Sequence, residues 1–163
     1  MIPSFIGFEQ GDPLAGLAFS LTLQLIVEMI QVEVPTLEVN TWYLDDGTLV
    51  GNKEELQMVV DIIEREGPAR GLHLSTAATV LAPAQPKSTV WCPRDLTSQE
   101  EDPLNRGIPR VREAGVVLLG APVGDYHFVR DTLERRVEKT GLTGGRQTSS
   151  SLTGWVAKMQ HWM

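Results

Sequence analysis

Asp45 and Asp46 are the residues of this sequence whose type and spacing could do chemistry. They stand side by side in WYLDDGTLVG, residues 42 to 51, which otherwise has the apolar character of a buried strand. Two adjacent like charges cost stability unless a cation or hydrogen-bond donors compensate for them. Carboxylates are ligands for magnesium, and two magnesium ions can clamp a phosphoryl transfer. A purely structural interpretation also holds, because aspartate and glycine favour tight turns.

The segment that positions the two aspartates is predicted to be a β-hairpin. Residues 37 to 50 form two short strands that are broken at Leu44-Asp45-Asp46-Gly47. An Asp-Gly pair between apolar runs is a strong hairpin signal. A rigid hairpin tip suits the presentation of oxygen ligands to a metal ion.

A long helix is predicted before the hairpin. Asp12 is a good N-cap and Pro13 suits the first helical position. One apolar face is expected to hold Leu14, Leu17, Ala18, Leu21, Leu25, Met29 and Val32. A second set widens that face almost all round: Phe19, Leu23, Ile26 and Ile30. This pattern predicts a deeply buried helix, and the polar residues within it argue against a membrane span.

Further elements complete a mixed α+β order with antiparallel strands. Asn52 and Glu55 approach the capping-box pattern of a second helix, which Gly67-Pro68 ends. The sequence then predicts a short apolar turn or strand at 71–74 and a strand at 88–91. After these we expect a strand that enters a turn or second hairpin around 116–124, and a helix at 128–139. Residues 140–163 have a flexible composition, so we expect a flexible or divergent tail.

The charge of the chain is unevenly distributed. The 163 residues carry a net charge of −7. Residues 1–66 hold twelve acids against two bases, a balance of −10, whereas residues 67–163 hold twelve bases against nine acids, a balance of +3. An acidic first half repels nucleic acid unless cations intervene. The charge therefore indicates either a solvated acidic surface or carboxylates that collect magnesium.

Two motifs together resemble the palm of a reverse transcriptase of the non-LTR retrotransposon type. The first motif is S-x-x-G-x-x-Q-G-D-P-L, which opens a long helix in that family and is matched by residues 4–14. The second is an aromatic-x-Asp-Asp hairpin, matched by Tyr43, Asp45 and Asp46. The pair stands in the family's order, with an apolar helix between its members. The resemblance implies a partial polymerase palm over residues 1–139, with an antiparallel sheet packed on helices. Residues 116–120 resemble the strand and glycine of the family's primer-grip hairpin.

The resemblance also implies roles for individual residues. Asp45 and Asp46 would be metal ligands for two Mg²⁺ ions. Tyr43 would pack near the primer end, although an ordinary strand aromatic explains it equally well. Gln10 and Gly11 would lie against the incoming nucleotide and the templating base pair.

Lys87 is the candidate for the lysine of the family's next motif. That motif opens with Gly-Leu-x-Leu, matched by residues 71–74, and residues 76 to 85 are expected to be an insertion before Lys87. Lys87 would then protonate the leaving pyrophosphate, or it is an exposed loop lysine. Five arginines could contact template and primer phosphates: Arg110, Arg112, Arg130, Arg135 and Arg136.

The family's third catalytic carboxylate precedes the Gln-Gly-Asp-Pro segment, and this sequence shows no counterpart of it or of a fingers region. We therefore expect a reverse transcriptase fragment that is inactive alone, although the intact family enzyme takes an RNA template, a DNA primer and deoxynucleoside triphosphates. One alternative is a non-catalytic remnant that binds nucleic acid or protein. Another is an unrelated magnesium phosphohydrolase, which would need Glu9, Glu38 or Glu54 near the two aspartates.

Overall fold

The computed structural model describes residues 13–76, 86–93, 101–140 and 155–162, the last group and residue 140 as backbone. The part of the chain that it describes is a mixed fold of helices and antiparallel strands, as predicted. Its elements are α1 (Ala15–Glu33), β1 (Val39–Tyr43), β2 (Asp46–Gly51), α2 (Lys53–Glu66), the 3-10 turn η1 (Pro68–Arg70), β3 (His73–Leu74), β4 (Thr89–Trp91), β5 (Gly115–Leu118), β6 (Ala121–Gly124), α3 (Tyr126–Thr140) and β7 (Trp155–Trp162).

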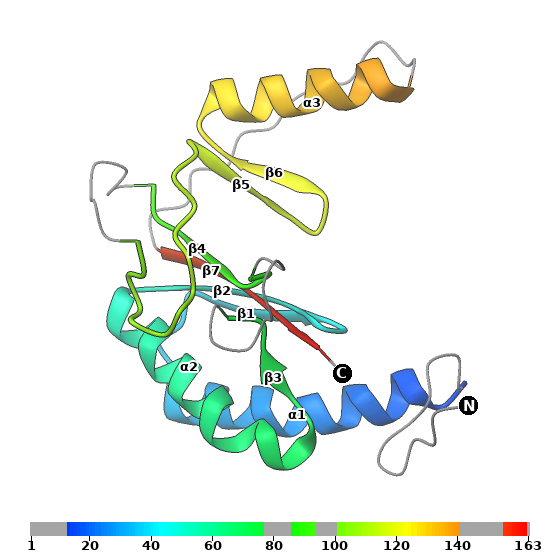
Figure 1. The fold of residues 1–163 in the computed structure, drawn as a ribbon, viewed down its shortest axis with the longest axis vertical. Helices are drawn as coiled ribbons and strands as arrows, with labels where there is room; N and C mark the ends of the chain where they lie inside the picture. Colours follow the sequence, from blue (N-terminus) through cyan, green and yellow to red (C-terminus); the bar gives the residue numbers. More distant parts are fainter. Residues whose placement is uncertain (1–12, 77–85, 94–100, 141–154, 163) are drawn as a thin grey trace.

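A five-stranded sheet forms the centre of the fold (Figure 1). β1 pairs with β2, β2 pairs with β7, and β3 and β4 both pair with the other edge of β7, all antiparallel. Figure 1 shows α1 and α2 on one side of this sheet, and the β5–β6 hairpin with α3 on the other. The arrangement is therefore a helix layer, a sheet and a second small layer.

The central strand β2 is buried on both faces, which fixes the hairpin that carries the two aspartates. Leu49 is fully buried in the cluster that α1 and α2 form, together with Leu56 and Ile30. The next residue, Val50, is buried in a second cluster with Trp91 and Val116. Because successive residues of a strand point to opposite faces, a slip of one residue would exchange these two contacts.

The second helix follows the sequence prediction closely. α2 begins after Asn52, whose side chain accepts a hydrogen bond from the Glu55 N–H at 2.8 Å. The Glu55 carboxylate in turn accepts from the Asn52 N–H at 2.7 Å, which completes the capping box. The helix ends at Glu66, before Gly67 and Pro68. Leu56, Val59 and Ile63 are buried, as expected from their spacing.

The first helix differs from its prediction in two respects. α1 begins at Ala15, with Pro13 and Leu14 in a turn before it, and Asp12 lies outside the described residues. The helix is also not buried all round. Phe19, Leu23, Ile26 and Ile30 are buried, but the set expected to lead the buried face is largely exposed: Leu14, Leu17, Leu21, Leu25 and Val32.

Among the described residues, α1 is long and apolar enough to cross a membrane by length and composition, with a mean hydropathy of 1.6. A helix from the core of a soluble protein passes the same test, so this property assigns no membrane span. The packing of one face of α1 on α2 shows what that face does in this fold.

The last strand lies where we expected a flexible or divergent tail. Trp155–Trp162 form β7, which pairs with β2 on one side and with β3 and β4 on the other. Local composition did not reveal it, because its partners lie far away in the sequence. Without β7, the described part of β2 would have only β1 beside it.

Candidate functional site

Asp45 and Asp46 lie at the tip of the β1–β2 hairpin, as predicted. Tyr43 pairs with Asp46, and the two residues between them, Leu44 and Asp45, form the turn. Asp45 is exposed and makes no hydrogen bond or ion pair with the described residues, whereas Asp46 is half-buried at the first position of β2. Asp46 also pairs with Gln160 of β7, so its backbone is held between two strands.

The turn is centred two residues earlier than the Asp-Gly signal indicates. Asp46 and Gly47 already belong to β2, and Leu44 occupies the first central position with φ +52°. That left-handed conformation is uncommon for a residue with a Cβ, and glycine, asparagine or aspartate usually takes it. The side chains of Tyr43 and Leu44 are 66% and 51% exposed, so the tip presents an apolar pair beside the carboxylates.

Gly47 leaves room for the Trp42 ring to pack across the hairpin, close to its tip. The two residues are directly paired across the hairpin. A Cβ on Gly47 would come within 2.5–2.7 Å of three ring carbons of Trp42. The indole N–H donates to the Asn40 side-chain oxygen at 2.8 Å, which holds the ring in place. The glycine of the Asp-Asp-Gly triplet therefore serves packing rather than the turn.

Lys87 lies at the same end of the sheet as Asp46. Thr89 of β4 and Thr48 of β2 both pair with Lys158 of β7, one on each side. Asp46 lies two residues before Thr48 within β2, and Lys87 lies two residues before Thr89, just ahead of the start of β4.

Ser75 secures this position of Lys87 although ten residues separate Ser75 from Pro86. The Ser75 hydroxyl oxygen accepts from the Lys87 N–H at 3.0 Å, and the Ser75 carbonyl accepts from the Ser88 N–H at 3.1 Å. Ser75 and Ser88 are both fully buried. Lys87 is therefore held just before β4 by Ser75, although the expected insertion precedes it and Lys87 itself is not in the sheet. Its side chain is exposed.

The remaining predicted site residues either lie outside the described residues or are buried or paired with carboxylates. Gln10 and Gly11, with the rest of the first motif up to Asp12, lie outside the described residues. Arg110 is only 7% exposed, so it does not reach phosphates from the surface. Two further arginines already pair with carboxylates, Arg112 with Glu101 and Arg130 with Asp131.

Of the carboxylates that a phosphohydrolase would require, Glu9 lies outside the described residues, and Glu38 and Glu54 are not at the hairpin tip. The Glu38 N–H donates to the Val50 carbonyl, at the end of the hairpin opposite Asp45. Glu54 lies in the first turn of α2, beyond that same end. Within the described residues no group of three or more His, Cys, Asp or Glu side chains could hold a metal ion. A magnesium site does not need three protein ligands. Magnesium often takes one or two carboxylates and completes its shell with water and phosphate oxygens, so the two aspartates alone are compatible with it.

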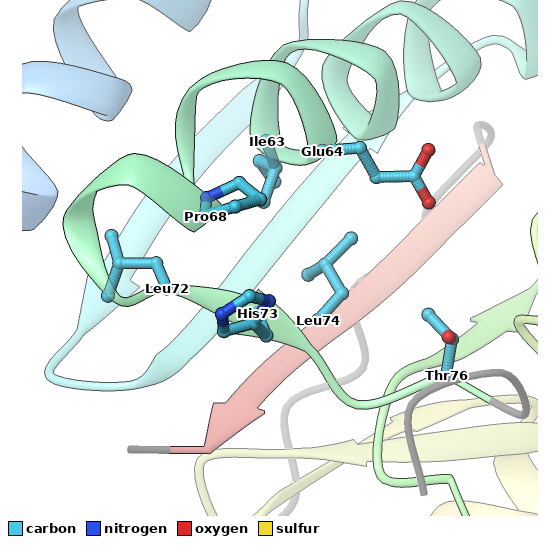
Figure 2. Close-up of a pocket in the computed structure, with 7 residues that line it drawn as sticks. All are labelled: Ile63, Glu64, Pro68, Leu72, His73, Leu74 and Thr76. Carbon is cyan, nitrogen blue, oxygen red and sulfur yellow. The ribbon is translucent and has the colours of Figure 1, made fainter.

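A small pocket lies elsewhere, between the end of α2, Pro68 and β3 (Figure 2). Its volume is about 80 Å³, well below the several hundred Å³ typical of ligand sites. In Figure 2 the Glu64 carboxylate points away from the His73 ring, so the two do not form a pair. The pocket is therefore too small to hold a nucleotide.

The functional element that sequence reasoning missed is β7, which holds Asp46 and the β4 end of the sheet in register. A signal for it exists, because Ala157-Lys158-Met159-Gln160 alternates apolar and polar residues with the period of a strand.

Comparison with known proteins gives no relative: no protein-family model, no curated protein and no solved structure matches the chain.

Proposed function

We propose that this chain is a palm fragment of a reverse transcriptase of the non-LTR retrotransposon type, and that Asp45 and Asp46 hold its catalytic magnesium. The observation that carries the proposal is the tip of the β1–β2 hairpin. Tyr-Leu-Asp-Asp spans a two-residue turn there, with Asp45 exposed and Asp46 fixed in the ladder. This geometry presents adjacent carboxylate oxygens at a rigid, accessible point.

The conformation of Leu44 supports a function beyond that of an ordinary turn. A non-glycine residue with positive φ costs on the order of 1–3 kcal/mol when the backbone is strained, and such residues cluster at functional sites. A turn selected only for stability would carry glycine or asparagine at this position. Leu44 has φ +52° and a half-exposed side chain next to Tyr43, so the tip keeps an apolar surface where a primer end would lie.

Two further features lie on the side of the molecule that a polymerase site would use. Lys87 shares the sheet end of Asp46. Figure 1 shows the tip of the β5–β6 hairpin on the same side as the tip of β1–β2. Leu119 and Gly120 form that second tip, both with positive φ, and by resemblance this hairpin corresponds to the primer grip.

The chemistry proposed is nucleotidyl transfer. A primer 3′-hydroxyl attacks the α-phosphate of a deoxynucleotide, and pyrophosphate leaves. Magnesium, when bound, neutralises the charge that develops on the phosphates. Asp45 and Asp46 would hold the ions by their oxygens, and Lys87 would give a proton to the leaving pyrophosphate.

A metal-binding measurement tests the role of the two aspartates without requiring activity. Mn²⁺ titrated into the ¹⁵N-labelled chain should broaden the amide signals of residues 43–47 first. Asp45→Asn and Asp46→Asn should each reduce this broadening. Asp61→Asn is the matched control, because Asp61 on α2 is an exposed carboxylate that already pairs with Arg106. Broadening that centres elsewhere, or that survives the double substitution, would contradict the assignment.

An incorporation assay tests the expected lack of activity. The chain, supplied with magnesium, deoxynucleotides and a DNA primer on an RNA template, should extend no primer. Extension that is lost in Asp45→Ala would refute inactivity while supporting the polymerase site. Salt-dependent binding of the hybrid without any metal requirement would instead favour a non-catalytic remnant.

A further inference from the structure

The two sides of the proposed site are connected through one strand, β7. Asp46 lies at the start of β2, and Lys87 lies just ahead of β4. Among the strands that the structure describes, β2 and β4 share no ladder, because each pairs with a different edge of β7 (Figure 1). Lys158 is the shared position, since it pairs with Thr48 on one edge and with Thr89 on the other. The relative placement of the two sides is therefore set by the backbone of β7.

Asp46 occupies the last pair of two ladders. It pairs with Tyr43 at the end of the β1–β2 ladder and with Gln160 at the end of the β2–β7 ladder. Asp45 lies outside both strands, in the turn. The ends of an element open at a lower free energy than its middle. The backbone that carries the two carboxylates is therefore the part of β2 that loses its order first when β7 separates from it.

The other edge of β7 is anchored on both sides of Gln160. β4 pairs with residues 156–158, and β3 pairs with residues 161 and 162. The Ser75 carbonyl accepts a hydrogen bond from the Ser88 N–H at 3.1 Å, which joins the chain after β3 to the chain before β4. Docking of β7 on this edge therefore fixes the backbone of Gln160, and with it the partner of Asp46.

A metal ion held by Asp45 and Asp46 would favour the docked state of β7. Two adjacent carboxylates repel each other, and a cation between them removes this cost. Magnesium also requires its ligands close to octahedral positions, which a frayed end of β2 does not supply. A ligand that binds one state more tightly shifts the equilibrium toward that state, and the coupling acts equally in both directions.

We propose that β7 is a docking strand for the metal site, so that the pairing of Trp155–Trp162 with β2 and the binding of metal by Asp45 and Asp46 are coupled. Metal binding closes β7 onto the sheet, and docked β7 sets the affinity for the metal. The inference rests on the proposed function, because it takes the two metal ligands from it. It adds control of that site by a strand that contributes only its backbone.

Hydrogen exchange tests the coupling in the unmodified chain. Without metal, the amides of residues 157–160 should exchange faster than those of Val59 and Val60, which are fully buried in α2, because β7 opens while α2 stays folded. Mg²⁺ at about ten times its dissociation constant should slow exchange in β7 about ten-fold, since the open state does not hold the ion. The combined substitutions Asp45→Asn and Asp46→Asn should abolish this slowing.

A proline in β7 tests the reverse direction. Met159 pairs with Gly47, in a strand that is paired on both edges. Proline removes a ladder hydrogen bond and is confined to edge strands, bulges and strand starts. Met159→Pro should therefore undock β7 and raise the Mn²⁺ dissociation constant at residues 43–47 about five-fold or more.

Trp155→Pro is the matched control for Met159→Pro. Trp155 is the first residue of β7, where proline is tolerated, and it lies at the end of β7 away from Asp46. This variant should bind Mn²⁺ as tightly as the unmodified chain. Both variants should keep the helical circular dichroism signal, and hydrogen exchange in the unmodified chain decides the question if Met159→Pro does not fold.

Failure of the coupling is distinguishable from failure of the proposed function. Mn²⁺ that does not bind at residues 43–47 would overturn both together. Metal that binds there but leaves exchange in β7 unchanged, or that binds folded Met159→Pro as tightly as the unmodified chain, would overturn the coupling alone. Amides of β7 that exchange only together with those of α2 would also overturn it, because β7 would then have no separate open state.

Discussion

The packing of Trp42 over Gly47 makes a single added methyl group informative about the hairpin that carries the two aspartates. In Gly47→Ala the new Cβ would lie 2.5–2.7 Å from three carbons of the Trp42 ring. Gly47 does not have a positive φ, so alanine meets no backbone penalty there. The ring cannot move freely either, because its N–H bonds to Asn40 and its carbons pack on the core cluster. The cost of the substitution is therefore steric.

The expected magnitude follows from two opposing contributions. Overpacking of a well-packed site costs about 1–3 kcal/mol, and replacing glycine by alanine returns about 0.4–1 kcal/mol through the unfolded chain. The net loss in the free energy of unfolding should be about 1.3 kcal/mol, within a range of about 0 to 2.6 kcal/mol. For a chain of this length, the central value lowers Tm by about 3–5 °C. Thermal and urea unfolding followed by far-ultraviolet circular dichroism measure both quantities.

A double-mutant cycle identifies the Trp42 ring as the cause. In a Trp42→Leu background, Gly47→Ala should be neutral or stabilising, which gives a coupling energy of at least about 1 kcal/mol. Gly16→Ala in α1 is the matched control, because no atom lies within 4 Å of its added Cβ, and it should stabilise by up to about 1 kcal/mol. An equal loss for Gly47→Ala in both backgrounds would refute the reasoning.

Two further predictions concern α2. Asn52→Ala removes the capping box with Glu55 and should cost about 0.5–2 kcal/mol, whereas Asn52→Gly should cost only a few tenths; a similar loss for both would show that the side-chain cap contributes nothing. Hydrogen bonds from Arg65 and Arg70 lower the pKa of the Glu66 carboxyl from its ordinary value of 4.5. The stability from these contacts is therefore present above about pH 4.5 and is lost as the pH falls through the lowered pKa. The advantage of the unmodified chain over Glu66→Gln should shrink between pH 6 and pH 3 in urea unfolding, and an advantage that grows on acidification would contradict this sign.

Local signals predicted the elements whose ends are marked by polar chemistry. α2 is the clearest case. Asn52 and Glu55 form the capping box at its start, and Gly67-Pro68 directly follow its last residue. The β1–β2 hairpin was also predicted, but its turn was misplaced, since the space beneath Trp42 rather than a turn geometry requires Gly47. No local rule anticipates a leucine with positive φ.

Features that depend on distant partners could not be predicted in the same way. α1 is apolar on two opposite faces, so periodicity alone does not decide which face packs on α2. The strand β7 has a weak pattern of its own and gains its place from β2, β3 and β4. The alignment of Lys87 with Asp46 requires both registers of β7. The carboxylate pair of the candidate site could thus be found from the sequence, but its geometric relation to Lys87 could not.

The position of β7 has a consequence for the order in which the protein is made. Synthesis delivers β2, β3 and β4 first, yet in the described residues each of them forms its ladder with Trp155–Trp162 and none with the other two. Nascent chains grow from the N-terminus at about 5–20 residues per second, so the ribosome holds an unfinished sheet for several seconds with β2 exposed along one edge. A premature stop before Trp155 would leave the aspartate hairpin without β7 permanently. We expect quality-control proteases to degrade such a truncated chain.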